Sequence, residues 1–397
     1  MSVRTAVVLA AGEGTRLRPL TRNRPKPMLP AADRPILEHV LDALVEADIE
    51  RLVLVVGYRR ERVQEHFGPA YRGTPIEYVG QAKQLGSGHA LLQARGVVDG
   101  PLVVVNGDQL VESEAVSSVV EAFERETAPA AMGVIEREDA GNYGAVRLRD
   151  RDVAEIVEKP GTDGFRLINA GVYAFEAAIF GAIEETPRTG GELALTDTLA
   201  RLVDSRRVRG VRVSGLWIDA TYPWDLLEVA TEVLARGRVR VSEHRGGIWV
   251  GEDARIHESA TLQPPVVVGP GCEVGAGTVV GPDVALGGNV TVGSNVTLER
   301  AVVETDSRVG HGATLLDAVL SQRVRLGADV TIPGGPGDVR VDRAVFENQR
   351  LGAVLADGVG VGGAATFEAG TLVGPGATVG AGTHVRGEVP ADTEVRR

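Results

Sequence analysis

The stretch from Val266 to Leu298, VVVGPGCEVGAGTVVGPDVALGGNVTVGSNVTL, repeats itself every six residues. A second column of small or β-branched residues stands two places before each aliphatic position, from Ile248 to Val296. Two inward columns in each strand-and-turn unit predict a β-solenoid, because one unit buries its apolar face only against its neighbours. The aliphatic column runs through Val250, Ile256, Leu262, Val268, Val274, Val280, Leu286, Val292 and Leu298.

The repeat continues toward the C-terminus with interruptions. Its phase slips by one residue at Val303 and again at Leu320. The stretch from Pro333 to Gln349 breaks the period, which returns at Leu355. We therefore expect residues 333–349 to be a loop ejected from the solenoid.

A different pattern precedes the solenoid. Short β-branched runs such as Arg51–Val56 and Leu102–Val105 alternate with helical patterns such as Ile36–Ala47 and Ala115–Glu124. Strands separated by helices predict parallel βαβ units in a three-layer α/β domain. The expected organisation is an α/β domain over 1–235, a linker over 236–250 and a solenoid over 251–397.

Composition limits the partners. The 397 residues carry a formal net charge of -12, and an acidic surface repels phosphate backbones and anionic headgroups. With no local basic patch, we expect neither nucleic acid nor membrane as a partner. The apolar run Ala6–Ala11 is shorter than a signal peptide core, and no stretch approaches the roughly 18 apolar residues of a membrane helix. One cysteine, Cys272, fits a cytoplasmic location.

Two short segments suggest phosphate chemistry. Gly12 and Gly14 follow the first apolar run and free backbone N–H groups to face a phosphate chain. The spacing fits neither a dinucleotide fingerprint, which needs a third glycine where Leu17 stands, nor a P-loop. Lys26 lies between two prolines, which predicts a stiff, non-helical segment, and it is one of three lysines in the chain.

Together, Gly12-Glu13-Gly14-Thr15-Arg16 and Pro25-Lys26-Pro27 resemble the sugar-1-phosphate nucleotidylyltransferase family over residues 1 to about 235. The resemblance implies a Rossmann-like nucleotidyltransferase domain in which Arg16 and Lys26 are catalytic cations. The segment Gln81–Ala90 resembles the base-recognition segment of the uridylyltransferases that act on N-acetylglucosamine 1-phosphate, where Gln81 would contact uracil. The implied nucleotide-binding residues are Leu9, Ala11, Gly12, Gly14, Thr15, Gln81, Gly86 and Ser87.

Asp108 follows the run Leu102–Asn106, at the strand end where ligands of open α/β sheets bind. The resemblance implies that Asp108 and Asp219 are ligands of Mg²⁺, which proteins usually hold with one or two carboxylates plus substrate phosphates and water. It also implies sugar contacts from Gly144, Glu158, Lys159 and Asn169.

The solenoid resembles the hexapeptide-repeat left-handed β-helix family, which implies a homotrimer or a dimer of trimers. The whole architecture resembles the archaeal bifunctional sugar-1-phosphate nucleotidylyltransferase/acetyltransferases. His311 matches their histidine-bearing coil, but Thr314 stands where a tyrosine is expected and no lysine follows Lys159. We therefore expect a scaffold with little or no acetyltransferase activity.

The expected reaction joins a nucleoside triphosphate, UTP favoured, to glucose or N-acetylglucosamine 1-phosphate and releases pyrophosphate. Three alternatives stay open. Leu17–Thr21 resembles thymidylyltransferases acting on glucose 1-phosphate, the β-helix could add acetyl transfer, and the chain could be a noncatalytic regulatory subunit. The presence of all four charged residues expected of a catalyst argues against a regulatory subunit; they are Arg16, Lys26, Asp108 and Asp219.

Overall fold

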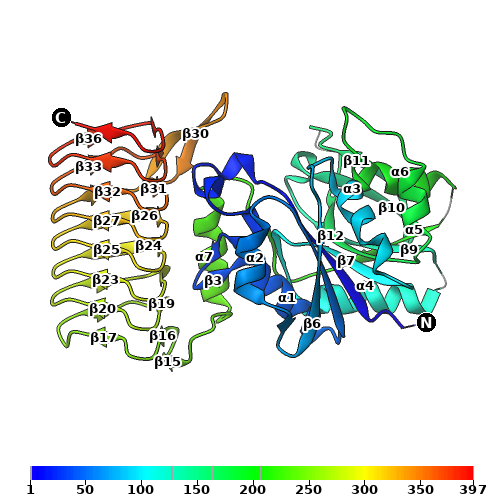
Figure 1. Ribbon diagram of the computed structural model, residues 1–397, viewed down its shortest axis with the longest axis horizontal. Helices are drawn as coiled ribbons and strands as arrows, with labels where there is room; N and C mark the ends of the chain where they lie inside the picture. The colour runs from blue at the N-terminus through cyan, green and yellow to red at the C-terminus, as the bar shows by residue number, and fades with distance from the viewer. Residues whose placement is uncertain (1, 127, 162–163, 206, 397) are drawn as a thin grey trace. The chain divides into compact units, whose positions relative to one another are not determined.

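The computed structural model describes residues 2–126, 128–161, 164–205 and 207–396, and the chain forms two compact units that alternate along the sequence (Figure 1). Some short segments near the N-terminus belong to the second unit. The first unit comprises Met1–Glu13, Pro25–Met28 and Ile36–Asp219; the second comprises Gly14–Arg24, Leu29–Pro35 and Ala220–Arg397.

The first unit is built on a ten-stranded sheet in the order β10-β11-β13-β9-β12-β7-β1-β4-β6-β5. Strand β1 (Thr5–Ala10) runs parallel between β4 (Arg51–Val56) and β7 (Leu102–Asn106). The other strands are β5 (Ala70–Tyr71), β6 (Thr74–Gly80), β9 (Ala130–Glu136), β10 (Gly144–Arg149), β11 (Asp152–Glu158), β12 (Leu167–Phe175) and β13 (Val208–Arg212). A separate ladder pairs β8 (Gln109–Val111) with β14 (Trp217–Asp219).

Helices cover both faces of this sheet, which confirms the three-layer α/β prediction. Alternate residues of β1 enter two apolar clusters: Ala6 and Val8 pack in one, Val7 in the other. The first cluster includes side chains of α1 (Ile36–Glu46), α2 (Arg60–Phe67) and α4 (Ser113–Glu126). The second includes those of α3 (Ser87–Leu92), α5 (Ile179–Glu184) and α6 (Leu195–Ser205).

The βαβ pattern predicted parallel strands, but the sheet is only partly parallel. Strand β12 runs antiparallel to both β7 and β9. It follows the antiparallel pair β10–β11, whose short connection carries no helix. Parallel neighbours need a long crossover, whereas antiparallel neighbours need only a short turn.

The backbone conformation at Lys26 also differs from the prediction. It begins a single 3-10 turn, Lys26–Met28, in which the Met28 N–H donates to the Pro25 carbonyl. Pro27 is tolerated there because the first residues of a helical turn have no intrahelical use for their N–H groups. The prediction of a non-helical segment was therefore wrong at this point. Further 3-10 turns are Thr15–Leu17, Leu20–Arg22, Gln93–Gly96 and Ala140–Asn142.

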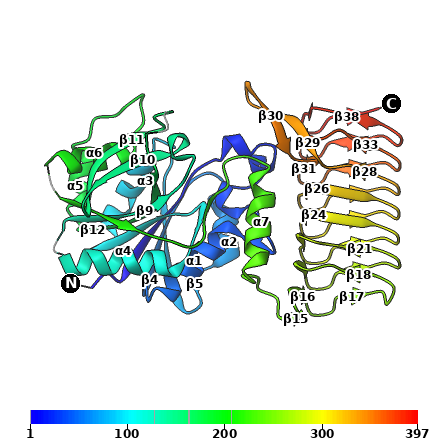
Figure 2. The ribbon, with the colours of Figure 1, turned by 180° about the vertical axis from the view of Figure 1, so that it is seen from behind.

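The second unit contains a parallel β-helix, as the six-residue period predicted (Figure 2). Ile248 of β16 pairs with Val266 of β19, which pairs with Val284 of β22, so one turn takes 18 residues or three six-residue repeats. Its interior is filled by the two predicted columns and their continuations.

The phase slips have a structural cause. Val284 pairs with Ala301, and Ala301 pairs with Ala318, so these turns contain 17 residues instead of 18. The residue is lost at a corner where Arg300, and then Asp317 one turn later, adopts a left-handed conformation with φ of 45° and 50°. One shortened unit per turn thus keeps the apolar columns in register.

The interrupted stretch leaves the coil but is more regular than the predicted loop. It forms an antiparallel hairpin of β29 (Pro336–Val341) and β30 (Ala344–Arg350), in which Val339 and Val341 are buried. The coil then resumes, because β31 (Ala353–Leu355) pairs directly with β26 (Thr314–Leu320).

The remaining elements of the second unit are one helix and many short strands. Helix α7 (Asp225–Ala235) packs against β22, β24 and β26. No helix within the described ranges is long and apolar enough to cross a membrane. The strands are β2 (Pro30–Ala31), β3 (Arg34–Pro35), β15 (Glu243–Arg245), β16 (Ile248–Val250), β17 (Arg255–Ile256), β18 (Thr261–Leu262), β19 (Val266–Val268), β20 (Glu273–Val274), β21 (Val279–Val280), β22 (Val284–Leu286), β23 (Thr291–Val292), β24 (Thr297–Val303), β25 (Arg308–Val309), β27 (Arg325–Leu326), β28 (Thr331–Ile332), β32 (Gly360–Val361), β33 (Thr366–Phe367), β34 (Thr371–Val373), β35 (Thr378–Val379), β36 (His384–Val385), β37 (Glu388–Val389) and β38 (Glu394–Val395).

Candidate active site

The first unit brings Lys26, Asp108 and Asp219 together. The Lys26 Nζ lies 2.7 Å from Asp108 Oδ2 and 2.7 Å from Asp219 Oδ1. The lysine side chain is 12% exposed, whereas the two carboxylates keep 32% and 17% of their surface. We call these three residues the lysine cluster.

Strand ends position the two carboxylates. Asp108 follows β7, and the adjacent Gly107 N–H donates to the Leu9 carbonyl of β1. Asp219 ends β14, where it pairs across the ladder with Gln109, the residue next to Asp108. Two segments far apart in sequence therefore deliver their carboxylates to one place at the carboxyl ends of β1 and β7.

The lysine cluster carries an excess of negative charge when all three groups are ionised. Burial lowers the pKa of Lys26, but Asp108 and Asp219 outweigh burial, so the pKa is raised and the ammonium stays charged. A single cation already bridges two oxygen donors, which are the ligands that hard divalent ions prefer. The donor set fits such an ion.

A divalent ion held by Asp108 and Asp219 would need further ligands. In the described part of the chain, no group of three or more His, Cys, Asp or Glu side chains could hold a metal ion. Asp108 and Asp219 would supply two carboxylates, and substrate phosphates and water would complete the coordination, as is common for magnesium sites.

Gln81 is 4% exposed, and its amide is fixed by neighbours. Its Nε2 donates to the Gly86 carbonyl at 3.2 Å and lies 2.9 Å from His89 Nδ1. Burial, with a contribution from Arg188, lowers the pKa of His89, so the neutral ring accepts this hydrogen bond. The amide can then direct its carbonyl oxygen elsewhere.

Gly86 and Ser87 make close contacts with a loop that had no predicted role. Gly86 has φ of 99°, and a Cβ there would lie 2.5 Å from the Leu193 carbonyl oxygen. The Ser87 hydroxyl accepts a hydrogen bond from the Leu195 N–H at 2.9 Å. The glycine is therefore required by backbone packing, whatever it also contributes to binding a base.

The loop after β1 is linked to this region. Gln84 Nε2 donates to the Ala11 carbonyl at 3.3 Å, and Leu9 accepts from Gly107. A Cβ on Gly12 would meet no atom within 4 Å. The contacts of Gly14, Thr15 and Arg16 place these three residues in the second unit. Gly14 has φ of 68°, and Arg16 is exposed. Their assignment to the site therefore depends only on their place in the sequence motif.

The predicted sugar-binding residues form a second group in the first unit. Gly144 pairs with Glu158 across β10 and β11, and a Cβ on Gly144 would lie 3.2 Å from Glu158 Oε2 and 3.7 Å from Asn169. Asn169 donates to the Tyr173 hydroxyl at 2.6 Å. Lys159 follows Glu158 with φ of 43°, and its N–H donates to the Tyr143 carbonyl.

Sequence reasoning missed several residues that hold these groups. Tyr173 supports Asn169, and burial together with the charge of Glu158 raises the pKa of Tyr173 to about 12, so its hydroxyl stays neutral. His89 and Gln84 orient the segment around Gln81. The only signal was their position within the already singled-out Gln81–Ala90 segment; for Tyr173 it was the Asn-x-x-x-Tyr spacing on one strand.

Both halves of the chain match known protein families. A model of the nucleotidyl transferase family matches residues 5–236, and one of the GMPPB C-terminal domain matches residues 262–389. The bifunctional protein GlmU of Methanococcus maripaludis is 31% identical over 408 residues, covering 98% of this chain and 96% of the relative.

Two further relatives cover the first half. The UTP–glucose-1-phosphate uridylyltransferase AglF of Haloferax volcanii is 37% identical over 225 residues, covering 55% of this chain and 92% of the relative. A solved structure of UDP-glucose pyrophosphorylase from Acinetobacter baumanii has a TM-score of 0.54 at 26% identity, covering 59% of this chain and 94% of that one. Since the first family model spans more than half of the residues, this chain belongs to the nucleotidyl transferase family and is a nucleotidyltransferase.

Proposed function

We propose that the protein transfers a uridylyl group from UTP to glucose 1-phosphate or N-acetylglucosamine 1-phosphate, forming a UDP-sugar and pyrophosphate. The observation that carries the proposal is the lysine cluster at the carboxyl ends of β1 and β7. The names of AglF and of the Acinetobacter enzyme, which specify UTP and UDP-glucose, support the choice of nucleotide.

The reaction needs no protein nucleophile. An ionised phosphate oxygen of the sugar phosphate attacks the α-phosphorus of UTP. The bond from that phosphorus to the bridging oxygen breaks, and pyrophosphate leaves with the electron pair. Catalysis then consists of aligning two anions and neutralising charge at the five-coordinate phosphorus and on pyrophosphate.

The chain's own cations supply part of that charge. Lys26 is a compact point charge held in place by two carboxylates, and Arg16 can grip phosphate oxygens with two parallel hydrogen bonds. Nucleotidyltransferases of this family generally use a divalent metal ion. In our proposal this ion is Mg²⁺, held by Asp108 and Asp219, and it neutralises phosphate charge when bound.

Recognition is assigned to two groups. The amide of Gln81 would meet the imide edge of uracil, and Leu9, Ala11, Gly12, Gly14, Thr15, Gly86 and Ser87 would line the nucleotide. Gly144, Glu158, Lys159 and Asn169 would bind the sugar phosphate, which is supported by the proximity of Gly144, Glu158 and Asn169.

The test is a matrix of purified protein with four nucleoside triphosphates and three sugar 1-phosphates, scored by pyrophosphate release. We expect the fastest turnover with UTP and a glucose-type phosphate. Faster turnover with dTTP would favour the thymidylyltransferase alternative. No turnover with any pair would contradict the proposal and favour a noncatalytic regulatory subunit.

We also propose that residues 251–397 organise a homotrimer or a dimer of trimers and that the protein is cytoplasmic. The β-helix presents flat coil faces that symmetric association could cover. Sedimentation of the full chain as a monomer at micromolar concentration would contradict the assembly. The buried thiol of Cys272, which forms no disulfide and donates to the Gly287 carbonyl at 2.9 Å, is in keeping with a reducing compartment.

Acetyl transfer by the β-helix is the second candidate, because the relatives matched over the full chain are named bifunctional. His311 lies at a coil corner, where its Nδ1 accepts the Ser294 N–H at 2.8 Å. Thr314 begins β26 where the resemblance expects a tyrosine. We expect little or no thiol release from acetyl-CoA with glucosamine 1-phosphate; turnover that disappears in His311→Ala would overturn this expectation.

A further inference from the structure

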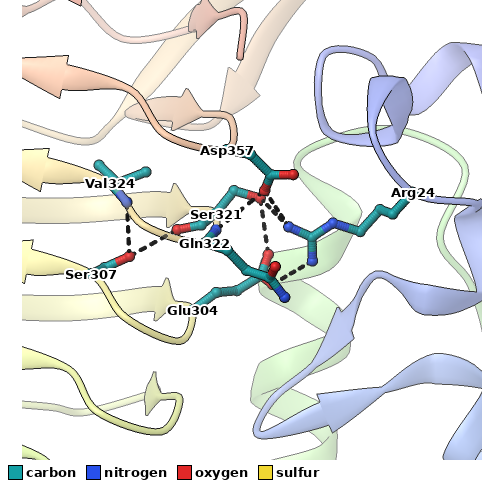
Figure 3. Close-up of polar contacts among 7 residues, drawn as sticks. All are labelled: Arg24, Glu304, Ser307, Ser321, Gln322, Val324 and Asp357. Atoms are coloured by element: carbon teal, nitrogen blue, oxygen red, sulfur yellow. Dashed lines mark hydrogen bonds and ion pairs between the residues drawn. The ribbon is translucent and has the colours of Figure 1, made fainter. Parts of the chain in front are cut away.

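Arg24 is an internal cation of the second unit. Its Nη1 pairs with Glu304, and its Nη2 contacts Asp357 Oδ1 at 2.5 Å and Ser321 Oγ at 2.8 Å (Figure 3). The side chains of Arg24, Glu304 and Asp357 are 6%, 9% and 6% exposed. We call these four residues the arginine cluster.

The three acceptors belong to successive coils of the β-helix. Val303, Leu320 and Leu355 pair in sequence, and Glu304, Ser321 and Asp357 follow them at one corner. Ser321 Oγ also donates to Glu304 Oε1 at 3.0 Å, and the Gln322 N–H donates to Asp357 Oδ1 at 3.3 Å (Figure 3). The corner is thus a prepared receptor for one guanidinium.

This arrangement is poorly explained by stability alone. Two carboxylates share one cation, and burial raises the pKa of Glu304 even though Arg24 opposes that change. Apolar residues of similar volume often stabilise a protein as well as a buried ionic set does. What the planar guanidinium adds is direction, because its fork accepts partners only in fixed positions.

Arg24 precedes Lys26 by two residues, with Pro25 between them. The guanidinium therefore fixes the chain directly before the lysine cluster.

A second anchor involves the segment that follows Asp219 in the sequence. Asp219 is followed by Tyr222 and Trp224, whose rings stack at 4.7 Å between centroids. Both rings contact Phe346 of the ejected hairpin, at 4.7 and 5.3 Å. The N–H groups of residues 221 and 222 donate to Asp225 at 2.7 Å each, so the segment after Asp219 is fixed as well.

We propose that the β-helix unit positions the catalytic charges: Arg24 is a positioning residue for Lys26, and Phe346 is one for Asp219. The proposal rests on the function proposed above for Lys26 and Asp219. Arg24 lies two residues before Lys26, and Tyr222 and Trp224, the rings that Phe346 contacts, lie three and five residues after Asp219. Loss of an anchor should shift that member relative to the other, and shifts of about 1 Å can cost about 100-fold in rate.

The experiment compares Arg24→Gln and Phe346→Ala with the control Arg300→Gln in the full chain. Arg300 pairs with buried Asp317 at 2.8 Å and donates to the Arg350 carbonyl of β30 at 3.4 Å. The control therefore breaks an ion pair in the same unit and at the base of the same hairpin, but it removes neither the Phe346 ring nor a member of the arginine cluster. For each protein we would measure kcat, both KM values and hydrogen exchange of peptides covering residues 20–30 and 217–225.

We expect both anchor variants to lose about 10- to 100-fold in kcat, while the KM values change by less than about threefold. Exchange should rise in residues 20–30 for Arg24→Gln and in residues 217–225 for Phe346→Ala. Arg300→Gln should retain wild-type kcat. Arg24→Lys, which keeps the charge but loses the fork, should fall between Arg24→Gln and wild type.

A folded Arg24→Gln variant with wild-type kcat, or a kcat loss matched by Arg300→Gln, would overturn the proposal. If Arg24→Gln does not fold, Glu304→Gln and Arg24→Lys provide the same comparison with milder changes. If the wild-type protein turns over no substrate pair, the proposed function fails. Hydrogen exchange then decides the anchoring alone, and unchanged exchange at both segments would reject it.

Discussion

Lys26 and Arg24 stand two residues apart, and each binds two carboxylates, yet the two clusters differ in exposure. Asp108 and Asp219 keep 32% and 17% of their side-chain surface, whereas Glu304 and Asp357 keep 9% and 6%. A carboxylate with surface remaining can accept another cation or a substrate-bound ion. A sealed carboxylate can only hold its present partner. In our proposals, the same ionic arrangement thus serves chemistry in one case and geometry in the other.

The largest difference should come from metal removal. We expect EDTA to abolish pyrophosphate release, because in our proposal Asp108 and Asp219 hold an ion that neutralises phosphate charge. The thermal unfolding temperature should stay unchanged, since the carboxylates of the arginine cluster are already paired with Arg24. Added Mg²⁺ should restore activity. Full activity after exhaustive chelation would refute the metal assignment.

Asp108→Asn should lower turnover by about 10²- to 10³-fold, the usual cost of a lost charge-stabilising contact. The variant should remain folded, because Asp108 is partly exposed and follows a well-paired strand. Asp306→Asn, on an exposed corner of the β-helix, serves as the control. Retention of more than about a third of wild-type kcat at saturating Mg²⁺ would show that Asp108 does not hold the ion.

Arg24→Gln should destabilise the folded protein by about 3–5 kcal/mol, because two buried carboxylates would lose their shared cation. Chemical unfolding followed by circular dichroism measures this change. Arg255→Gln, which removes the exposed Arg255–Glu273 pair, should have a negligible effect. Equal effects of both substitutions would mean that the arginine cluster is not sealed in solution.

The smallest effect concerns Glu304 and pH. Burial raises the pKa of Glu304 in the folded protein above the ordinary value of 4.5. At a pH just above 4.5, the folded protein therefore still holds a proton that the unfolded chain has released. The stability linked to that proton is fully present below 4.5 and is lost as pH rises through the folded pKa. The facing groups are Arg24, Asp357 and Ser321.

The Glu304→Gln variant has no carboxyl group to titrate, so it does not lose this stability as pH rises. The difference in unfolding temperature, variant minus wild type, should therefore increase as pH rises from about 4 to about 8. A difference that is flat, or that changes in the opposite direction, would contradict the raised pKa.

Much of this molecule could be predicted from local sequence patterns. The six-residue period determines the β-helix because each unit repeats the same burial on its neighbours. The place of Asp108 at the ligand-binding end of a strand was predictable, since a run of aliphatic residues ends just before it. Its meeting with Asp219 depended on the family resemblance, because the β8–β14 ladder joins strands too short to leave a pattern.

The anchors were invisible for a different reason. Arg24 looked like one more arginine before a proline, and Glu304 lies 280 residues further along the chain. Local sequence contains no information about such a pairing. The hairpin did leave a trace, the alternation of Val339 and Val341, but the break in the six-residue period over residues 333–349 predicted only a loop.

The placement of Glu304, Ser321 and Asp357 on successive coils also restricts how such a chain can change length during evolution. Coils can be gained or lost at the far ends of the β-helix without moving the arginine receptor. A coil inserted among the three would move the acceptors about 4.8 Å further apart, beyond the reach of one guanidinium. The hairpin of β29 and β30 lies within this interval of sequence but leaves the coil, and Leu320 still pairs with Leu355. The hairpin therefore adds residues where the chain could least tolerate an extra coil, because it lengthens the chain without lengthening the β-helix.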